Sequence, residues 1–553
     1  GILFCNKAFE AIGYKNALVV KDAPDDPDFD GTDGRHNVVR WIMSRNSAYA
    51  VAWFRPSPVT GEILNAAVTV DANYPASALT EFKTEVLGVT RRPWIDEWYE
   101  MSIARTNIDR ALRGTGYRKV ACDHAHELMD EGRYGFAALQ ASGLPVDAKE
   151  YADILVADLI AHEVGHCLGL RHNFAASTLH PSQKLKDFDT VSKLGVASSV
   201  MDYTPVNVAA VLAGNKGYYN PTIGAYDLWA IQYGYGDVPG TTMQEEVEGL
   251  SAIARRSGEP GLMYLTDEDA DGVNPLAVRW DLGQDLLGYL KDRATADRLI
   301  QNYAVTKATG VNEPYTVRNG LILRTIRGRY RSASTASRIV GGVEFRRQFK
   351  GDSGEVPTLR PVAAAKQRDA MRYIIQNALL ADLDDLPQNV LHGLSQNPDI
   401  GGAEYIAPLR QYIGMQQRVT LGQLTNQDKI FQITENAFKT KNEADRYTLT
   451  EHYNMLFSAV FAEIGQNKSI APLKRDLQRY FVTILIGQST GNAGMVNDDA
   501  RMICSAALGR IKTRISQQLA KSDSLDEITS LHLQDLNGQI DRFLKRQATL
   551  PPN

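Results

Sequence analysis

Three histidines and a glycine, spaced within the stretch HEVGHCLGLRH, restrict this chain to few folds. The first two, His162 and His166, are four positions apart, so on an α-helix they lie on one face and can reach the same metal ion. The preceding segment EYADILVADLI, at 150–160, is apolar at helical intervals and contains no proline or glycine. These patterns predict a buried helix over about 149–168 that carries part of a metal site.

Gly169 determines whether the third histidine can join that site. If the helix continued beyond His166, His172 would lie on a different face. Glycine can adopt the left-handed backbone conformation that ends a helix and turns the chain. We therefore expect His172 to turn back as a third ligand. Three imidazoles suit Zn²⁺ and leave a fourth position open for water.

Glu163 directly follows the first predicted ligand and is not expected to bind the metal itself. Its carboxylate would lie beside the ion, where it can accept a proton from the attacking water and pass it to the leaving amine. A metal-free core containing three histidines is disfavoured, because buried imidazoles without partners are costly. The sequence therefore predicts one catalytic Zn²⁺, held by His162, His166 and His172.

The full spacing is the metzincin signature, and a second segment resembles the same group. The segment Ser198–Tyr203, SSVMDY, resembles the Met-turn, in which a methionine forms an apolar floor beneath the zinc ligands. The resemblance makes Met201 that floor. It also makes Tyr203 the tyrosine that in some metzincins binds zinc or the transition-state oxyanion. The alternatives are an ordinary core methionine and an ordinary aromatic at the rim.

Further segments resemble a family of large bacterial zinc-dependent metalloproteases with an EcxA-like zinc-binding domain. They are GLRHNFAAS at 169–177, RHNVVRW at 35–41 and TGEIL at 60–64. The segment GAYDLWAIQYG at 224–234 resembles the helix that closes metzincin catalytic domains. The resemblance covers residues 1 to about 240. It implies an α+β fold in which a mixed twisted sheet packs on a long zinc-binding helix. It also implies a protein or peptide substrate and a secreted, periplasmic or cell-surface location.

The length of 553 residues exceeds what one core usually supports. We expect a zinc peptidase domain over 1–240, with a helical insertion at about 79–145, and a mainly helical accessory region over 241–553 that could form two subdomains. A linker is expected at 236–265. Helical periodicity further along marks 364–380, 404–417, 426–438, 443–464, 470–486 and 496–520.

The N-terminal part is expected to contribute a short helix and the sheet. Residues 1–13 read as a helix stopped by glycine, and this abrupt start suggests a preceding segment, either removed by processing or cut from the sequence. Strands are predicted at 16–20, 48–54 and 63–70. In metzincins such a strand edges the cleft and pairs with extended substrate through backbone hydrogen bonds.

Composition excludes several classes of function. The formal net charge is −5 and no basic face is evident, so nucleic acid is not an expected partner. No apolar run is long enough for a transmembrane helix. The four cysteines are too few for a disulfide framework, although one or two bridges could form. Oligomeric state is not predicted.

A calcium site could exist in the segment DEDADG at 267–272. It starts like an EF-hand loop, but Val278 replaces the glutamate needed at the twelfth position. A different calcium loop could use Asp267, Asp269 and Asp271, with Asn274; a solvated acidic turn is the alternative. The acidic stretch at 22–33 is a weaker candidate. A second metal at Cys122, His124 and His126 is disfavoured, because positions i and i+2 do not share a helix face.

The combined patterns predict a zinc-dependent endopeptidase in which Glu163 acts as general base and then acid. One alternative is a latent or inactive metzincin scaffold that acts as a binding protein. The other is a zinc hydrolase of a non-peptide substrate. Retention of Glu163 argues against an inactive scaffold, because such a scaffold could lose it.

Overall fold

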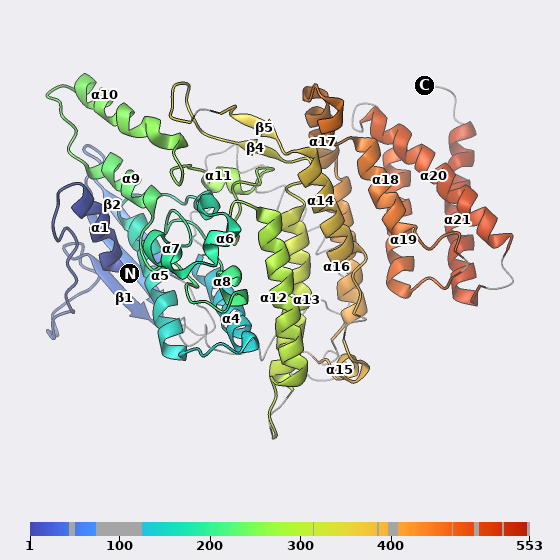
Figure 1. Cartoon of the computed structure of the whole chain (residues 1–553), viewed down its shortest axis with the longest axis horizontal. Coiled ribbons are helices and arrows are strands. Elements are labelled where there is room, and N and C mark those ends of the chain that lie inside the picture. Colours follow the sequence, from blue (N-terminus) through green and yellow to red (C-terminus); the bar gives the residue numbers. More distant parts are fainter. Residues whose placement is uncertain are drawn as a thin grey trace.

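The computed structural model describes residues 1–43, 50–72, 124–312, 315–354, 356–383, 386–395, 407–466, 468–490, 497–521 and 525–549. Its described part combines a small mixed sheet with many helices, in keeping with the expected α+β class. Figure 1 shows an elongated arrangement, with the sheet and the N-terminus at one end and the C-terminus near the other. No helix in these ranges is both long and apolar enough to cross a bilayer.

The sheet contains β1 (Val38–Ile42), β2 (Ala50–Pro56) and β3 (Ile63–Asp71) in the order β1-β3-β2. β1 runs parallel to β3, whereas β2 pairs with β3 in the antiparallel sense. This confirms the predicted pair of strands. Within the described residues β2 has β3 as its single neighbour, so its other edge faces away from the sheet.

The strand predicted at 16–20 is wrong. The side chain of Asn6 donates to the carbonyl of Leu18 and accepts from its amide, both at 2.8 Å. Asn16 adopts a positive φ of 52°. The backbone groups that a strand would offer to a neighbour are thus bound locally. Asn6 itself begins α1 (Asn6–Ala11), which with the 3₁₀ turn η1 (Ile2–Cys5) forms the predicted N-terminal helix.

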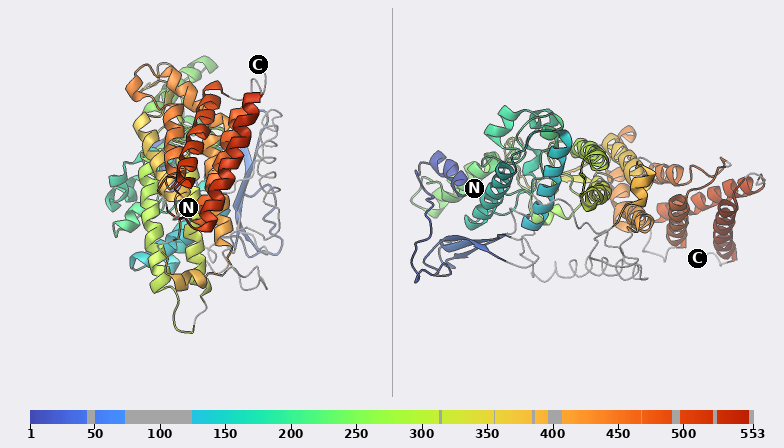
Figure 2. Two further views of the ribbon diagram at one scale, coloured as in Figure 1. Left: turned by 90° about the vertical axis from the view of Figure 1, so that its right-hand side faces the viewer. Right: turned by 90° about the horizontal axis from the view of Figure 1, so that it is seen from below.

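The predicted long helix is α5 (Ala148–Cys167), and it packs on β2 and β3. Asp147 caps its N-terminus by accepting a hydrogen bond from the amide of Glu150. α4 (His124–Ser142) lies beside α5 and forms the end of the predicted helical insertion, whose residues 79–123 lie outside the described ranges. In Figure 2 the sheet lies along one side of these helices.

The linker predicted at 236–265 is wrong over its central part, which forms α10 (Met243–Ala254). Thr242 and Glu245 form a reciprocal capping box there, and this satisfies amides at the helix start. The helix before it, α9 (Ala225–Tyr235), matches the expected closing helix of a metzincin domain.

The remaining elements are mostly helices, in agreement with the predicted helical region. Short elements between α5 and α9 are η2 (Ala176–Leu179), α6 (Ser182–Leu185), α7 (Phe188–Leu194) and α8 (Val208–Leu212). After α10 follow η3 (Arg255–Gly258), α11 (Asp267–Ala270), α12 (Leu286–Thr306), α13 (Thr316–Ala336), β4 (Val343–Phe345), β5 (Leu359–Pro361), α14 (Ala364–Ile374), the π-helical turn η4 (Ile375–Leu379) and α15 (Gln388–His392). The chain continues with α16 (Leu409–Thr425), α17 (Gln427–Lys439), η6 (Glu443–Asp445), α18 (Leu449–Val460), α19 (Pro472–Thr490), α20 (Asp498–Leu519) and α21 (Glu527–Thr549).

The pair α12 and α13 joins the two ends of the molecule. It lies between the α4–α5 region and the later helices (Figure 1), and α12 packs on both α4 and α8. Arg293 of α12 makes a bidentate ion pair with the buried Glu131 of α4. Tyr134 of α4 donates to Asp297 of α12 at 2.9 Å. One hydrophobic core runs from Cys5 to Phe543, and the boundary predicted near residue 240 stays a prediction.

His452 in α18 should make the stability of the helical region depend on pH. Its ring is fully buried, donates to the carbonyl of Leu424 and contacts the hydroxyl of Tyr447. Burial lowers its pKa from 6.5 to about 4. The unfolded chain therefore binds the proton more readily, so stability is fully present above pH 6.5 and is lost as the pH falls toward 4. We expect a loss of roughly 3 kcal/mol from this residue.

Thermal unfolding of wild type and His452→Gln between pH 7 and pH 4 measures this contribution. The variant should be less stable at neutral pH but should show a shallower decline as the pH falls. Parallel declines in the two proteins would contradict the assignment to His452.

Candidate active site

The end of α5 gives the histidines their positions. His162 and Glu163 are fully buried on the helix. The helix ends in a Schellman arrangement, in which the amide of Gly169 donates to the carbonyl of His166 and that of Leu170 to the carbonyl of Gly165. Gly169 has a φ of 85°, which confirms the predicted left-handed glycine. The turn brings the chain back toward the helix.

The three predicted ligands, His162, His166 and His172, meet at one point. Their candidate ligand atoms all lie within 4.8 Å of one another, and the Nε2 atoms of His166 and His172 are 3.2 Å apart. Within the described residues this is the one group of three or more such side chains close enough to hold a metal ion.

The Nδ1 atoms of the three histidines all have acceptors on the protein. They face the carbonyl of Val200 at 2.7 Å for His162, the carbonyl of Leu170 at 2.9 Å for His166, and Asp267 Oδ1 at 2.8 Å for His172. Each Nδ1 therefore carries the proton, which leaves the Nε2 lone pairs for a metal. Burial, helped by the neighbouring His172, lowers the pKa of His166 to about 4 and keeps that ring neutral. These features fit Zn²⁺.

Asp267 is a site residue that sequence reasoning placed elsewhere. It starts α11, 95 positions after His172, and was expected as a calcium ligand. Burial alone would raise the pKa of this carboxyl, but contacts with His172, Arg279 and Arg171 hold it well below its usual range. Asp267 is thus an anionic partner that orients the His172 ring. No local sequence signal joins two residues so far apart.

Replacing Asp267 with asparagine should weaken zinc binding by about 10- to 100-fold, because an orienting carboxylate is lost while the three ligands remain. The readout is the zinc dissociation constant in competition with a chelating dye. Asp271→Asn on the same segment is the matched control, since Asp271 pairs with Arg279 and does not touch a histidine. Equal zinc affinity in wild type and Asp267→Asn would contradict the role.

Glu163 lies next to the histidines and is fully buried. Neither of its carboxylate oxygens has a hydrogen-bond partner. Burial raises its pKa to about 7, and the nearby backbone amide of Ala52 in β2 opposes that rise. A buried carboxylate without partners is costly, and such groups mark positions where a ligand or water completes the bonding.

Met201 lies against α5 at Gly165, on the helix that carries His162 and His166, as the Met-turn resemblance implies. It is fully buried, and a Cβ added at Gly165 would lie 2.2 Å from its sulfur. Asp227 of α9 holds the turn by accepting from the hydroxyl of Ser199 at 2.6 Å and from the amide of Val200 at 3.0 Å. The carbonyl of Val200 in turn faces His162 Nδ1. The buried carboxylate of Asp227 therefore supports the position of His162 indirectly.

Tyr203 lies beside the histidine group and contacts His172. Its hydroxyl is 3.2 Å from His172 Nε2. The ring packs against Phe174 and Trp280, with centroids 5.1 and 5.4 Å away. Trp280 also donates its backbone amide to the carbonyl of Tyr203. The site thus includes residues beyond 240, because both Asp267 and Trp280 contact it.

The structure does not gather the acidic residues predicted for calcium. Asp269 accepts from the amide of Thr266 and from Arg347, whereas Asp271 pairs with Arg279. The side-chain amide of Asn274 donates to the carbonyl of Phe345. In the stretch at 22–33, the carboxylates of Asp26, Asp30 and Asp33 accept from nearby backbone amides. Calcium binding stays a prediction.

The cysteines in the described part of the chain are thiols. Cys5 and Cys504 are buried, and the half-buried Cys167 packs against the core outside the histidine group. Cys122 and the side chains of His124 and His126 lie outside the described residues, so the disfavoured second metal site is not addressed.

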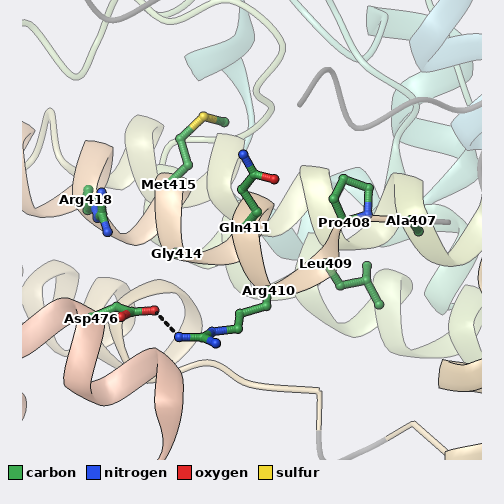
Figure 3. Close-up of a pocket in the computed structure, with 9 residues that line it drawn as sticks. All are labelled: Ala407, Pro408, Leu409, Arg410, Gln411, Gly414, Met415, Arg418 and Asp476. Atoms are coloured by element: carbon green, nitrogen blue, oxygen red, sulfur yellow. Dashed lines mark hydrogen bonds and ion pairs between the residues drawn. The ribbon is translucent and has the colours of Figure 1, made fainter. Parts of the chain in front are cut away.

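A cavity of about 580 Å³ lies far from the histidines in the helical region, at the start of α16. Figure 3 shows its lining, in which Arg410 forms an ion pair with Asp476 of α19 at 3.0 Å. No residue of the histidine site contributes to it. We assign it no part in the chemistry of that site.

Comparison with known protein families gives one match. The model of a family described as Met-zincin matches residues 145–468, which include the three histidines, Glu163, Met201, Tyr203 and Asp267. No curated protein and no solved structure gives a significant match.

Proposed function

The chain belongs to the Met-zincin family, and we propose that it is a zinc-dependent endopeptidase that hydrolyses peptide bonds. The observation that carries the proposal is the convergence of three imidazoles beside a buried carboxylate without partners. Three neutral nitrogen ligands leave zinc an open coordination position, which distinguishes catalytic from structural zinc sites.

His162, His166 and His172 would hold the zinc ion through their Nε2 atoms. When bound, the ion would polarise the scissile carbonyl and acidify the attacking water. The protein's own contribution begins with orientation, since Val200, Leu170 and Asp267 each fix one imidazole ring through its Nδ1 atom.

Glu163 would move the proton. Its carboxylate oxygens make no hydrogen bond to the protein, so a water molecule can bind to them. Glu163 would accept a proton from this water as it attacks the carbonyl carbon, and would deliver that proton to the departing amine nitrogen. The carboxylate is thereby regenerated at the end of each cycle.

β2 would bind the substrate backbone. Its outer edge is free within the described residues, and the amide of Ala52 lies near the Glu163 carboxyl. A peptide added along this edge would form backbone hydrogen bonds that depend little on sequence. It would also pass beside the catalytic carboxylate, where its scissile bond must lie.

Tyr203 would donate a hydrogen bond to the oxyanion that develops on the scissile carbonyl. Its hydroxyl already lies beside His172 Nε2, and Phe174 and Trp280 hold its ring in place. Replacing Tyr203 with phenylalanine should reduce kcat by about 10²-fold, because one oxyanion donor is lost. Steady-state kinetics at saturating substrate measures this, with the exposed Tyr233→Phe as control. An unchanged kcat would make Tyr203 a packing residue.

Two other functions would use the same scaffold. A latent or inactive binding protein would retain the fold without turnover, and a zinc hydrolase could act on a non-peptide bond. The intact Glu163, together with the free edge of β2, favours peptide hydrolysis. Extracellular location and the EcxA-like domain type stay predictions.

Digestion of a peptide library by the zinc-loaded protein tests the proposed function. We expect cleavage that a zinc chelator stops. A zinc-loaded protein that leaves every library peptide intact would contradict the proposal and would favour one of the two alternatives.

A further inference from the structure

A pocket of about 460 Å³ is lined in part by Met263 and Tyr264, which shortly precede Asp267 in the sequence. Its walls come from α9, from α10 with η3, from residues 263–264 and from the loop between β4 and β5. Figure 1 shows α10 and the β4–β5 hairpin on the same side of the molecule. The mechanism above does not use this pocket.

The lining of this pocket is strongly basic. It includes Arg255, Arg346, Arg347 and Lys350. Arg347 pairs with Asp269 at 2.8 Å. The other three have no ion pair and no side-chain hydrogen bond within the described residues. Three cations without an ion pair at one pocket contrast with the formal net charge of −5 for the whole chain.

Asp352 is the one carboxylate among the lining residues, and within the described part of the chain it forms no ion pair with those cations. It accepts from the hydroxyl of Ser257 at 2.7 Å and from the amide of Phe349 at 2.8 Å. Its bonds close the β4–β5 loop onto η3, and the amide of Ser353 adds a bond to the carbonyl of Arg255. The wall that carries the cations is therefore tied to the helical wall.

Aromatic side chains give the pocket a firm apolar surface. Trp229 is fixed by a hydrogen bond from its indole nitrogen to the carbonyl of Ile253. Tyr264 stacks on Tyr226, with ring centroids 5.8 Å apart. Arg346 is half-buried at this pocket. Aromatic walls such as Trp229 and Tyr264 are poorly polarisable, and they strengthen the attraction between a guanidinium and an anion.

Two contacts connect the pocket to the histidine site. Met263 lines the pocket, and its carbonyl accepts a hydrogen bond from the side chain of Asn173, the residue after His172. Arg347 pairs with Asp269, which lies two residues after Asp267, the partner of His172. The segment 263–269 thus contributes both to the histidine site, through Asp267, and to the pocket wall, through Met263 and Tyr264.

We propose that this pocket binds the carboxylate of an aspartate or glutamate side chain in the peptide substrate, at a fixed number of residues from the scissile bond. The proposal rests on the proposed peptidase function and names acidic peptides as its substrate class. Arg346 and Arg255 would supply planar, bidentate donors to the carboxylate, and Lys350 would add a third positive charge. The aromatic walls would pack on the methylene groups of the bound side chain.

Matched peptides that differ only by glutamate or glutamine at one position test the proposal. We expect kcat/KM to be about tenfold or more higher for the glutamate peptide at one position, because hydrogen bonds to charged groups are stronger. In Arg346→Gln and Arg255→Gln the ratio of kcat/KM for the glutamate peptide to that for the glutamine peptide should fall toward unity. Arg360→Gln should keep it, since Arg360 lies on the same hairpin but does not line the pocket. Zinc content and thermal unfolding of each variant verify folding.

The outcomes separate this inference from the proposed function. Cleavage with equal rates for both peptides at every position would overturn the pocket assignment and leave the peptidase intact. A preference for glutamate that persists in both arginine variants would also overturn it.

Peptide binding provides a readout that does not require turnover. Fluorescence anisotropy with labelled forms of the same peptides can be measured on the wild-type protein. If no peptide is cleaved but the glutamate peptides bind more tightly in an Arg346-dependent manner, the pocket stands and the peptidase proposal fails. Absence of both cleavage and acid-selective binding would overturn the two together.

Discussion

Replacing Glu163 with alanine is expected to reduce peptide cleavage by about 10³-fold while zinc binding is retained. The size of this reduction is typical of the loss of a general acid–base catalyst. Glu163 would accept a proton from the attacking water and pass it to the leaving amine. Zinc should remain because the three imidazoles and their Nδ1 partners are unchanged. The measurements are kcat/KM on a cleaved library peptide and zinc content per chain.

Stability provides a second readout for Glu163. Its carboxylate is buried and has no hydrogen-bond partner, so the folded protein gains little from it. The alanine variant should unfold at the same temperature as wild type or a higher one. Glu150→Ala is the matched control, because Glu150 lies exposed in the first turn of the same helix. Full activity in Glu163→Ala would refute its role, and a large loss of stability would make that role structural.

Removal of zinc is expected to abolish cleavage and to lower the unfolding temperature. Three imidazoles converge at one buried point, so the apo site loses the ion that holds them together. A ligand present at about a thousand times its dissociation constant stabilises the folded state by ~4 kcal/mol. Dialysis against a chelator, followed by calorimetry and a cleavage assay, measures both effects. Added Zn²⁺ should restore both the cleavage and the unfolding temperature.

A ligand substitution provides the control for metal removal. His166→Ala should behave like the chelated protein and should not recover when Zn²⁺ is added. His36→Ala should behave like wild type, since His36 is exposed and lies outside the histidine group. Cleavage that survives zinc depletion would contradict the metal dependence.

Local patterns predicted that the three histidines lie together. The spacing of His162 and His166 follows helical geometry, and the left-handed backbone at Gly169 follows from the freedom of glycine. These effects act within a few residues, so one sequence is enough to reveal them. The position of Met201 against α5 came from a resemblance to a known turn.

Long-range partners could not be predicted in the same way. Asp267 binds His172 from 95 positions away, and Asp227 supports the Met-turn from a separate helix. The acidic segment at 267–271 resembled a calcium loop. In the fold, Arg171, Arg279 and Arg347 arrive from three other segments and bind its carboxylates. A pattern of acids alone does not reveal which cations the fold will bring to them.

The two wrong secondary-structure predictions have local causes. At 16–20 the apolar residues suggested a strand, but the Asn6 side chain binds both backbone groups of Leu18. At 236–265 a linker was expected, yet Thr242 and Glu245 cap a helix there. In both places a side-chain hydrogen bond to the backbone determined the structure.

The central claim is that this Met-zincin chain is a peptidase whose activity depends on zinc bound at the histidine site. The most direct test measures zinc content and peptide-library cleavage on the same purified sample, before and after treatment with a chelator. We predict about one zinc ion per chain together with cleavage, and the loss of both after chelation. Zinc-free protein that cleaves peptides, or zinc-loaded protein that cleaves none, would contradict the claim.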